Sequence, residues 1–209
     1  MVQLMVDYTA LAIFIPTFFF VSITPGMCMT LAMTLGMSVG VRRTMWMMMG
    51  EVIGVALVAI AAVIGVASIM LKYPDVFTIV KYLGGLYLAY IGLQMWLSKG
   101  SMTISNETQS NVNRVTLFNQ GLFTAISNPK GWAFMISLLP PFINIEKAVA
   151  PQLTLLVVII MISEFVCMMV YASGGKTLRV FLSKGDNVKL MNRIAGSLMV
   201  GVGAWLAFG

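Results

Sequence analysis

Two acidic residues lie alone inside long apolar stretches of this chain. Glu51 lies within residues 44–71 and Glu164 within residues 150–173. The other five acids lie in loops or near the ends of apolar stretches: Asp7, Asp75, Glu107, Glu146 and Asp186. An ionised carboxylate deep in hydrocarbon is costly, so such an acid usually faces a cavity, pairs with a base or stays protonated. Glu51 and Glu164 could therefore carry a proton or hold a substrate ammonium, and the sequence leaves open which one carries the proton.

Each acid also has a structural interpretation that involves no substrate. Glu51 lies near one end of its stretch and could extend its carboxylate to the membrane surface. Lys130 lies inside another apolar stretch and could be a structural partner of either acid.

Two proline motifs interrupt long apolar stretches. Thr24-Pro25-Gly26 lies within residues 8–37, and Asn128-Pro129-Lys130 lies within residues 116–143. Proline removes a backbone donor, and glycine tolerates the φ values of an unwound turn. If each helix breaks there, its second half presents free N–H groups and a positive dipole end, which attract a carboxylate. We therefore predict a substrate-binding role for Thr24, Pro25, Gly26, Asn128, Pro129 and Lys130, with a kink repaired by Ser22 or Thr24 as the structural alternative.

Other chemistries have little support in the sequence. The chain has no histidine, and Cys28 and Cys167 form no CxxC pair, which argues against a bound metal and a thiol relay. We predict no cofactor and no enzyme, because no nucleophile–base pair or metal-ligand spacing is present. The 19 methionines would suit copper(I) but are also ordinary apolar filler. A membrane metal-ion or redox-related transporter of similar architecture is the alternative to a transporter of a small substrate that carries an ammonium and a carboxylate.

The composition of the chain indicates that these apolar stretches lie in a lipid bilayer. Of 209 residues, 59% are hydrophobic and 10% are charged, with a mean hydropathy of +0.94. A soluble domain of this size could not bury so much apolar surface. We predict an all-α membrane protein with one transmembrane domain over residues 1–209. Its six expected spans are about 8–37, 44–71, 76–97, 116–143, 150–173 and 189–208, and the polar segments 98–115 and 174–188 are expected to be solvated loops.

The basic residues predict the orientation of the chain. Assigning loops to alternate sides gives one side Arg42, Arg43, Lys99, Arg114, Lys176, Arg179, Lys184, Lys189 and Arg193. The other side receives Lys72, Lys81 and Lys147. The richer side should be cytoplasmic, so both termini should face outward. Orientation explains the net charge of +6 better than nucleic-acid binding does.

The two halves of the chain resemble each other. Aligning Pro25 with Pro129 also aligns Phe19 with Phe123. Further along, Gly85 and Gly92 align with Gly196 and Gly203 at one offset, and the second and fifth spans hold the two lone acids. Three spans per half would invert the second copy, as in many secondary transporters. We predict two inverted three-helix repeats, about 8–97 and 116–208, joined by a cytoplasmic loop over about 98–115, with the first and fourth helices broken at proline.

Several glycines recur at the spacing that lets helix backbones approach closely. These are Gly36-x-x-x-Gly40, Gly50-x-x-x-Gly54 and, in the third span, Gly84, Gly85 and Gly92. We expect them to be packing contacts, and such faces could also support a homodimer.

Taken together, these motifs closely resemble the lysine-exporter/RhtB (LysE-type) family of bacterial amino-acid exporters. The resemblance rests on Thr24-Pro25-Gly26 in the first span, the glycine-rich second and third spans, and "SNPKGW" (127–132) opening the fourth. Met27 stands where the family motif often has a second proline. The resemblance implies export of an amino acid or amino-acid derivative from the cytoplasm, driven by an ion gradient, usually of protons. Combined with the paired breaks and acids, it predicts a proton antiporter with an amino acid, protons and the lipid bilayer as its partners.

Overall fold

The structure, a computed structural model, describes residues 8–72, 74–98, 112–144 and 147–208. Within these ranges every regular element is helical, as predicted. The elements are α1 (Tyr8–Ile23), α2 (Met27–Ser38), α3 (Val41–Lys72), α4 (Pro74–Leu97), α5 (Arg114–Ile126), α6 (Pro129–Leu138), η1 (Pro140–Phe142), α7 (Val149–Ser183) and α8 (Gly185–Phe208). Most of the loop expected over 98–115 lies outside the described residues.

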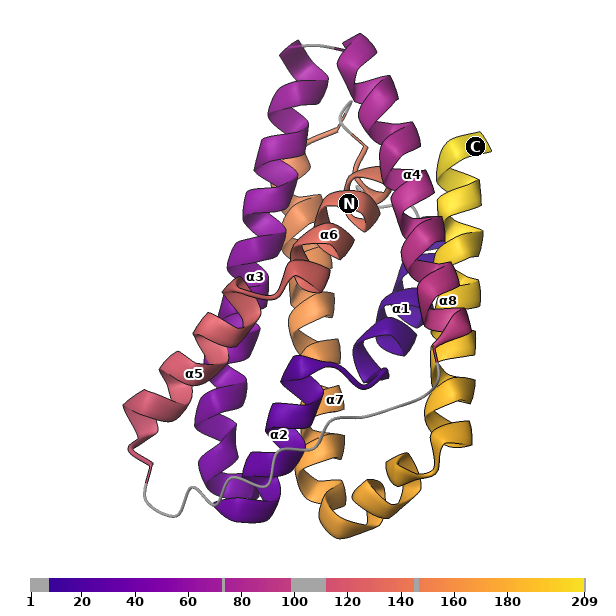
Figure 1. Cartoon of the computed structure of the whole chain (residues 1–209). Helices are drawn as coiled ribbons and strands as arrows, with labels where there is room; N and C mark the ends of the chain where they lie inside the picture. The colour runs from indigo at the N-terminus through magenta and orange to yellow at the C-terminus, as the bar shows by residue number, and fades with distance from the viewer. Residues whose placement is uncertain (1–7, 73, 99–111, 145–146, 209) are drawn as a thin grey trace.

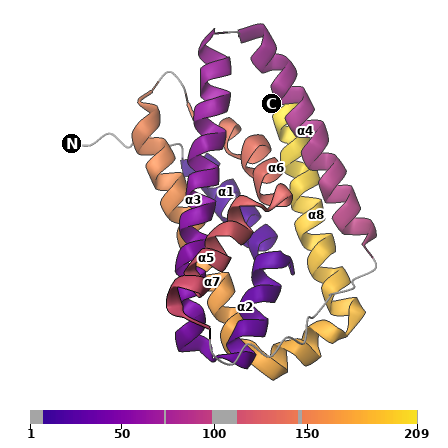
Figure 2. The same ribbon diagram turned by 60° about the vertical axis from the view of Figure 1, so that its left-hand side comes forward.

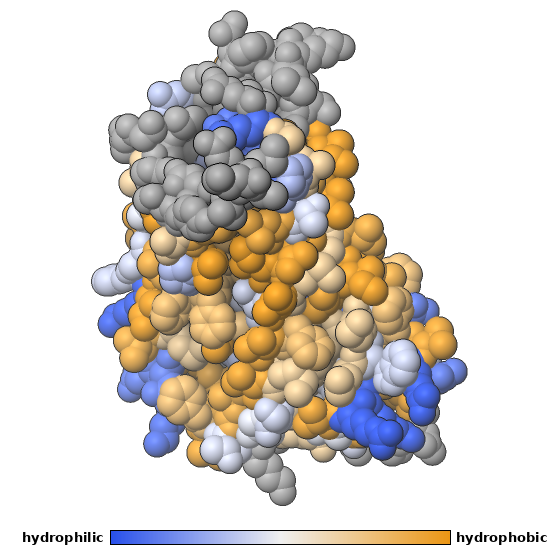
Figure 3. All heavy atoms as spheres, turned by 180° about the vertical axis from the view of Figure 1, so that it is seen from behind, coloured by the Kyte–Doolittle hydropathy of each residue, from blue (hydrophilic) through white to orange (hydrophobic). Residues whose placement is uncertain are grey.

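Some of these helices are long and apolar enough to cross a membrane. In the described part of the chain, Val41–Gly65 of α3 and Val149–Gly175 of α7 meet both criteria by themselves. Ala10–Ile23 and Met27–Ser38 meet them together as a pair bent by 55°, which gives two spans or three. Hydrophobic side chains cover the middle of the surface and hydrophilic ones gather toward its ends (Figure 3), as a bilayer requires.

Both predicted helix breaks are present. α1 ends at Ile23 and α2 begins at Met27, while α5 ends at Ile126 and α6 begins at Pro129. Proline alone does not cause a break here, because Pro16 lies inside the continuous helix α1. The interruption occurs where proline coincides with residues that favour the end or start of a helix.

Backbone-to-backbone packing at glycine holds neighbouring helices together. A Cβ atom on Gly50 of α3 would collide with the Phe118 carbonyl of α5, and one on Gly121 of α5 would collide with the Met47 carbonyl of α3. On the other side of the molecule, α4 and α8 lie side by side (Figures 1 and 2). The contacts there pair Gly92 with Gly196 and Gly85 with Gly203.

The predicted packing role is confirmed at Gly36, Gly50, Gly54, Gly85 and Gly92, which all lie in close helix contacts. For Gly40 the prediction is wrong. This residue forms the turn between α2 and α3 with φ of 82°, and a Cβ atom there would meet nothing within 4 Å.

The polar segment 174–188 is helical, and the expectation of a solvated loop is wrong. α7 continues to Ser183 across a kink at Gly175, where φ is 43°, and α8 begins at Gly185. The helical form is explained by buried apolar side chains, because Leu182 and Val188 pack into a cluster with residues of α2, α3 and α7. Composition suggested a loop because the exposed residues between these two are polar.

Candidate functional site

At the first break, carbonyls at the end of α1 accept hydrogen bonds, whereas the amides at the start of α2 have no side-chain cap. At the end of α1, Thr24 Oγ1 donates to the Phe20 carbonyl at 2.7 Å, and the Tyr171 hydroxyl donates to the Ile23 carbonyl at 2.8 Å. α2 then begins after Gly26, which provides no side-chain cap. The first amides of a helix have no partner within it, so the start of α2 offers free N–H groups.

Gly26 does not supply the unusual backbone angle that the sequence suggested. Its φ of −149° and ψ of −173° are extended and open to any residue. A Cβ atom there would approach only the Thr24 carbonyl, at 3.9 Å. What glycine provides is the missing side chain, since any residue with a polar side chain could occupy the amides of α2.

The second break is built differently. Pro129 is the first residue of α6, where its missing N–H has no cost. The Asn128 side chain accepts a hydrogen bond from the Lys130 amide at 3.1 Å and so caps α6. Trp132 Nε1 donates to the Ile126 carbonyl at 2.8 Å and ties α6 back to the end of α5. The role of the start of α6 in binding a carboxylate stays a prediction. One of its backbone amides, that of Lys130, already donates to the Asn128 side chain.

Glu51 is buried, so the interpretation that it extends to the membrane surface is wrong. Its side chain is 1% exposed, and its Oε2 atom has no hydrogen-bond partner among the described residues. The side chain instead lies beside Cys28 of α2, inside the helix bundle. A buried carboxyl oxygen without a partner costs free energy unless a proton or a cation satisfies it.

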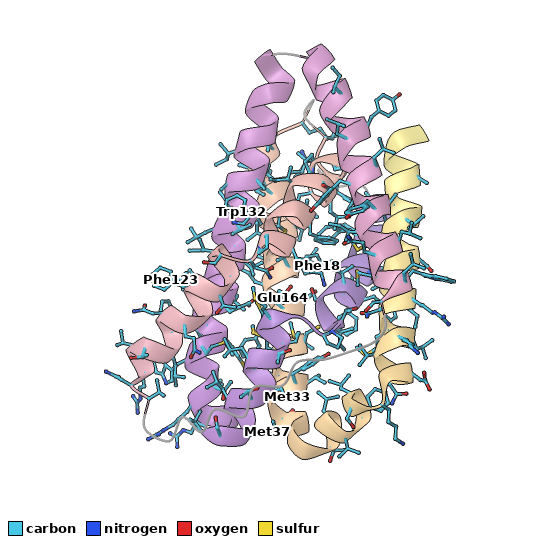
Figure 4. The ribbon with its side chains drawn as sticks, in the orientation of Figure 1. Phe18, Met33, Met37, Phe123, Trp132 and Glu164 are labelled. Carbon is cyan, nitrogen blue, oxygen red and sulfur yellow. The ribbon has the colours of Figure 1, made fainter. Side chains whose placement is uncertain are left out.

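Glu164 lies at the centre of the molecule (Figure 4) and already has a partner. Ser22 Oγ donates to Glu164 Oε1 at 2.9 Å, which links α7 to α1. Lys130 is close enough to attract Glu164 electrostatically. The structural alternative for Lys130 therefore retains support, although the described residues show no direct ion pair between the two side chains.

All the predicted site residues line one cavity of about 400 Å³, which we call the central cavity. They are Thr24, Pro25, Gly26, Glu51, Asn128, Pro129, Lys130 and Glu164. The beginnings of α2 and α6 therefore face the same space as both acids. This arrangement places cation-binding and anion-binding groups around a cavity that is large enough for one small molecule.

A larger space of about 840 Å³, which we call the vestibule, adjoins the central cavity at both breaks. It is lined by α2, by the last turns of α4 down to Ser98, by α5 and by the first turns of α8 from Val188. α2, α5 and the first turns of α8 extend toward the end of the molecule where α3 begins with Arg42 and Arg43, and we call this the basic end (Figure 1). Gln94, Gln120 and Asn192 add polar side chains to the vestibule wall.

Buried aromatic rings close the central cavity at the opposite end. Phe18 of α1 and Phe134 of α6 line the cavity, with ring centroids 5.8 Å apart. Phe14 stacks on Phe18 at 5.7 Å and meets Phe142 of η1 edge-on at 5.0 Å. The site is therefore accessible from the basic end and sealed at the other.

Several lining residues were not identified from the sequence. Cys28 was considered only for redox chemistry, yet its side chain lies beside Glu51 in the cavity wall. Val55 and Val58 also line the cavity. Their spacing of four and seven residues from Glu51 places them on the same face of a helix, which is a signal that the sequence did contain.

Comparison with known proteins gives a consistent picture. A family model described as LysE type translocator matches residues 19–209. The homoserine/homoserine lactone efflux protein of Salmonella typhimurium is 27% identical over 186 residues, which cover 89% of this chain and 90% of that protein. The leucine efflux protein of Enterobacter sp. is 29% identical over 191 residues, which cover 90% of each chain. No solved structure matches the chain.

Proposed function

The chain belongs to the LysE type translocator family, as its motifs predict, and from this premise we propose that it exports an amino acid or amino-acid derivative by proton antiport. It is a membrane protein with several helical spans and a transporter, not an enzyme. One observation carries the proposal: two helix starts and two acids, one with an unpartnered oxygen, line a single buried cavity. The names of the homoserine and leucine efflux relatives support a small amino-acid substrate.

The proposed membrane arrangement completes the picture. Six segments cross the bacterial inner membrane as two inverted three-span repeats, with both termini outside and the basic end in the cytoplasm. The excess of lysine and arginine at that end supports this orientation. The vestibule then admits substrate from the cytoplasm.

In the proposed complex, the substrate is held at both charged ends. Its carboxylate binds the uncapped amides at the start of α2 and the Lys130 ammonium. Its ammonium binds Glu51 Oε2, the buried oxygen that has no partner. Glu164 is held by Ser22 and lies near Lys130, so we assign it to positioning Lys130 rather than to binding the substrate.

Proton and substrate transport are coupled because the proton and the substrate ammonium compete for the same acid, Glu51. Glu51 holds either a proton or the substrate ammonium, because both satisfy the same oxygen. Substrate arriving from the cytoplasm displaces the proton to that side, and a proton from outside displaces the substrate after the cavity opens there. One proton enters for each zwitterion that leaves.

Glu51→Gln should abolish accumulation of amino acid driven by a pH gradient. The amide cannot exchange a proton and cannot form a charged pair with an ammonium, so we expect a loss of at least about 10-fold, which corresponds to about 1.4 kcal/mol. The measurement is uptake of labelled amino acids into inside-out vesicles with an imposed pH gradient.

Asp186→Asn is the matched control, because this acid is exposed in the first turn of α8 and pairs with Lys189. It should leave uptake unchanged. If Glu51→Gln transports like the unmodified protein, the proposed proton role of Glu51 is wrong.

A further inference from the structure

The polar and apolar residues of the central cavity occupy different levels. Ser22, Asn128 and Lys130 lie at or within about one turn of the two breaks, Glu164 accepts a hydrogen bond from Ser22, and Glu51 lies beside Cys28 at the start of α2. Beyond them, toward the closed end, the lining consists of Phe18 and Val21 of α1, Val55 and Val58 of α3, and Phe134 and Met135 of α6. None of these six side chains carries a hydrogen-bond donor, and the Met135 thioether is only a weak acceptor.

Three helices carry this apolar lining in the same direction. On α3, Val55 and Val58 lie four and seven residues past Glu51, or roughly 6 and 10 Å along the axis. On α6, Phe134 lies five residues past Pro129, on the side away from the basic end. On α1, Phe18 precedes the first break by nearly two turns. The apolar lining therefore ends at the contact between the rings of Phe18 and Phe134.

This closed end can accept only an apolar group. A hydroxyl, amide or ammonium placed there would lose its hydrogen bonds to water and find none in the wall, at a cost of several kcal/mol. Packing holds the side chains at this closed end in place, since Val58, Phe18 and Phe134 are each at most 3% exposed. The site cannot readily enlarge to admit water beside a polar group.

We propose that Val55, Val58, Phe18 and Phe134 form the side-chain subsite and select a neutral amino acid with a hydrocarbon or thioether side chain. The inference rests on the proposed function. With the α-ammonium at Glu51, the side chain extends along Val55 and Val58 until it meets the two aromatic rings. Lysine, whose ammonium would enter this subsite, and homoserine, whose hydroxyl would do so, are rejected.

The first test is a substrate panel in inside-out vesicles. Leucine and methionine should be transported at least about 10-fold better, by kcat/KM, than homoserine and lysine, the range expected for hydrophobic-pocket discrimination. Equal or better transport of homoserine or lysine would overturn the subsite while leaving amino-acid export intact. If no amino acid is transported at all, the proposed function fails together with the subsite.

The second test changes the subsite without changing its shape. Val58→Thr replaces a methyl group by a hydroxyl, so the ratio of leucine to homoserine transport should fall several-fold. Val166→Thr on α7 is the matched control, because Val166 is 44% exposed on the outer surface, and its ratio should not change. An unchanged ratio in Val58→Thr would contradict the subsite.

The third test fills the subsite. Val55→Phe should reduce leucine transport at least about 10-fold and leave alanine transport nearly unchanged, since only the longer side chain needs the occupied space. Leu57→Phe, at a position 51% exposed on the opposite face of α3, should affect neither substrate. Equal loss of both substrates in Val55→Phe, at normal abundance in the membrane, would exclude a side-chain-selective role.

Discussion

At Gly26 the structural role of glycine differs from the role that the sequence suggests. Next to proline inside an apolar stretch, glycine predicts an unusual backbone angle, yet the angles here are extended. The useful property is the absence of a side chain at the position that caps α2. A capping side chain would satisfy the same amides that we assign to the substrate carboxylate.

Gly26→Asn should therefore weaken substrate binding while leaving the fold intact. Asparagine is a favoured N-cap and would occupy the amides of α2, so the loss of a charge-assisted hydrogen bond should raise KM at least about 10-fold. The measurement is initial uptake rate against substrate concentration, together with thermal stability in detergent.

Gly26→Ala is the matched control, since alanine adds a Cβ atom with nearly 4 Å of clearance and offers no cap. Its KM should stay close to that of the unmodified protein. A larger rise in KM for alanine than for asparagine would show that the position is sterically restricted and that capping is not the cause.

The charged and proline-linked residues that line the central cavity could be predicted from the sequence because those residue types are rare inside apolar spans. Glu51, Glu164 and Lys130 contrast with their surroundings, and so does the pair of proline motifs. Val55, Val58 and Phe134 do not contrast, because any apolar residue suits lipid as well as a cavity wall. Only the packing of α1, α3 and α6 determines which face of each helix lines the cavity.

The contact between α3 and α5 is what positions Glu51. Gly50, Gly54 and Gly121 let the two backbones meet directly, and this contact lies beside the acid on one side and the second break on the other. Substitution at this contact should therefore reduce activity as well as stability.

Gly121→Ala should destabilise the protein and reduce transport together. Its Cβ atom would collide with the Met47 carbonyl, which is backbone and cannot rotate away. We expect a cost of about 1–3 kcal/mol, typical of overpacking, measured as a lower Tm in detergent alongside uptake.

Gly201→Ala provides the comparison on α8, where a Cβ atom would meet nothing within 4 Å. It should leave transport unchanged and raise stability slightly, by about 0.5–1 kcal/mol, as expected for glycine replaced inside a helix. If Gly121→Ala is as well tolerated as Gly201→Ala, the contact does not position Glu51.

The helices could be predicted from hydropathy more reliably than the connections between them. α3 and α4 begin within a few residues of the predicted stretches, because long apolar runs in lipid must be helical. Residues 174–188 were misjudged because they are mostly polar, although Leu182 and Val188 bury one face. A short amphipathic helix at a membrane surface has the composition of a loop and is recognised only from what it packs against.

The whole molecule is closed at one end and open at the other. At the closed end α1 contacts α8 and α6 contacts α4. Toward the basic end the vestibule separates α2 and α5 from the same α4–α8 pair. Export requires the reverse arrangement at some stage, so the rings of Phe18 and Phe134 must part.

Cross-linking residues 18 and 134 should therefore stop transport. In a background with Cys28 and Cys167 replaced by serine, Phe18→Cys with Phe134→Cys should lose transport when a cleavable bifunctional thiol reagent joins the two cysteines and recover it when the reagent is cleaved. The measurement is uptake before and after each treatment.

The single variants Phe18→Cys and Phe134→Cys, treated with the same reagent, should keep their transport. A cross-linked double variant that still transports would mean that the substrate does not pass between these two helices.

The glycine contact between α4 and α8 has a consequence for how such a change is made. The carbonyl of Gly92 fills the space where residue 196 would carry a side chain, and Gly196 does the same to residue 92. Neither helix can rotate about its own axis without driving a carbonyl into its neighbour. We therefore expect the two helices to tilt together as one rigid pair, so that the α4–α8 side of the vestibule moves in a single piece.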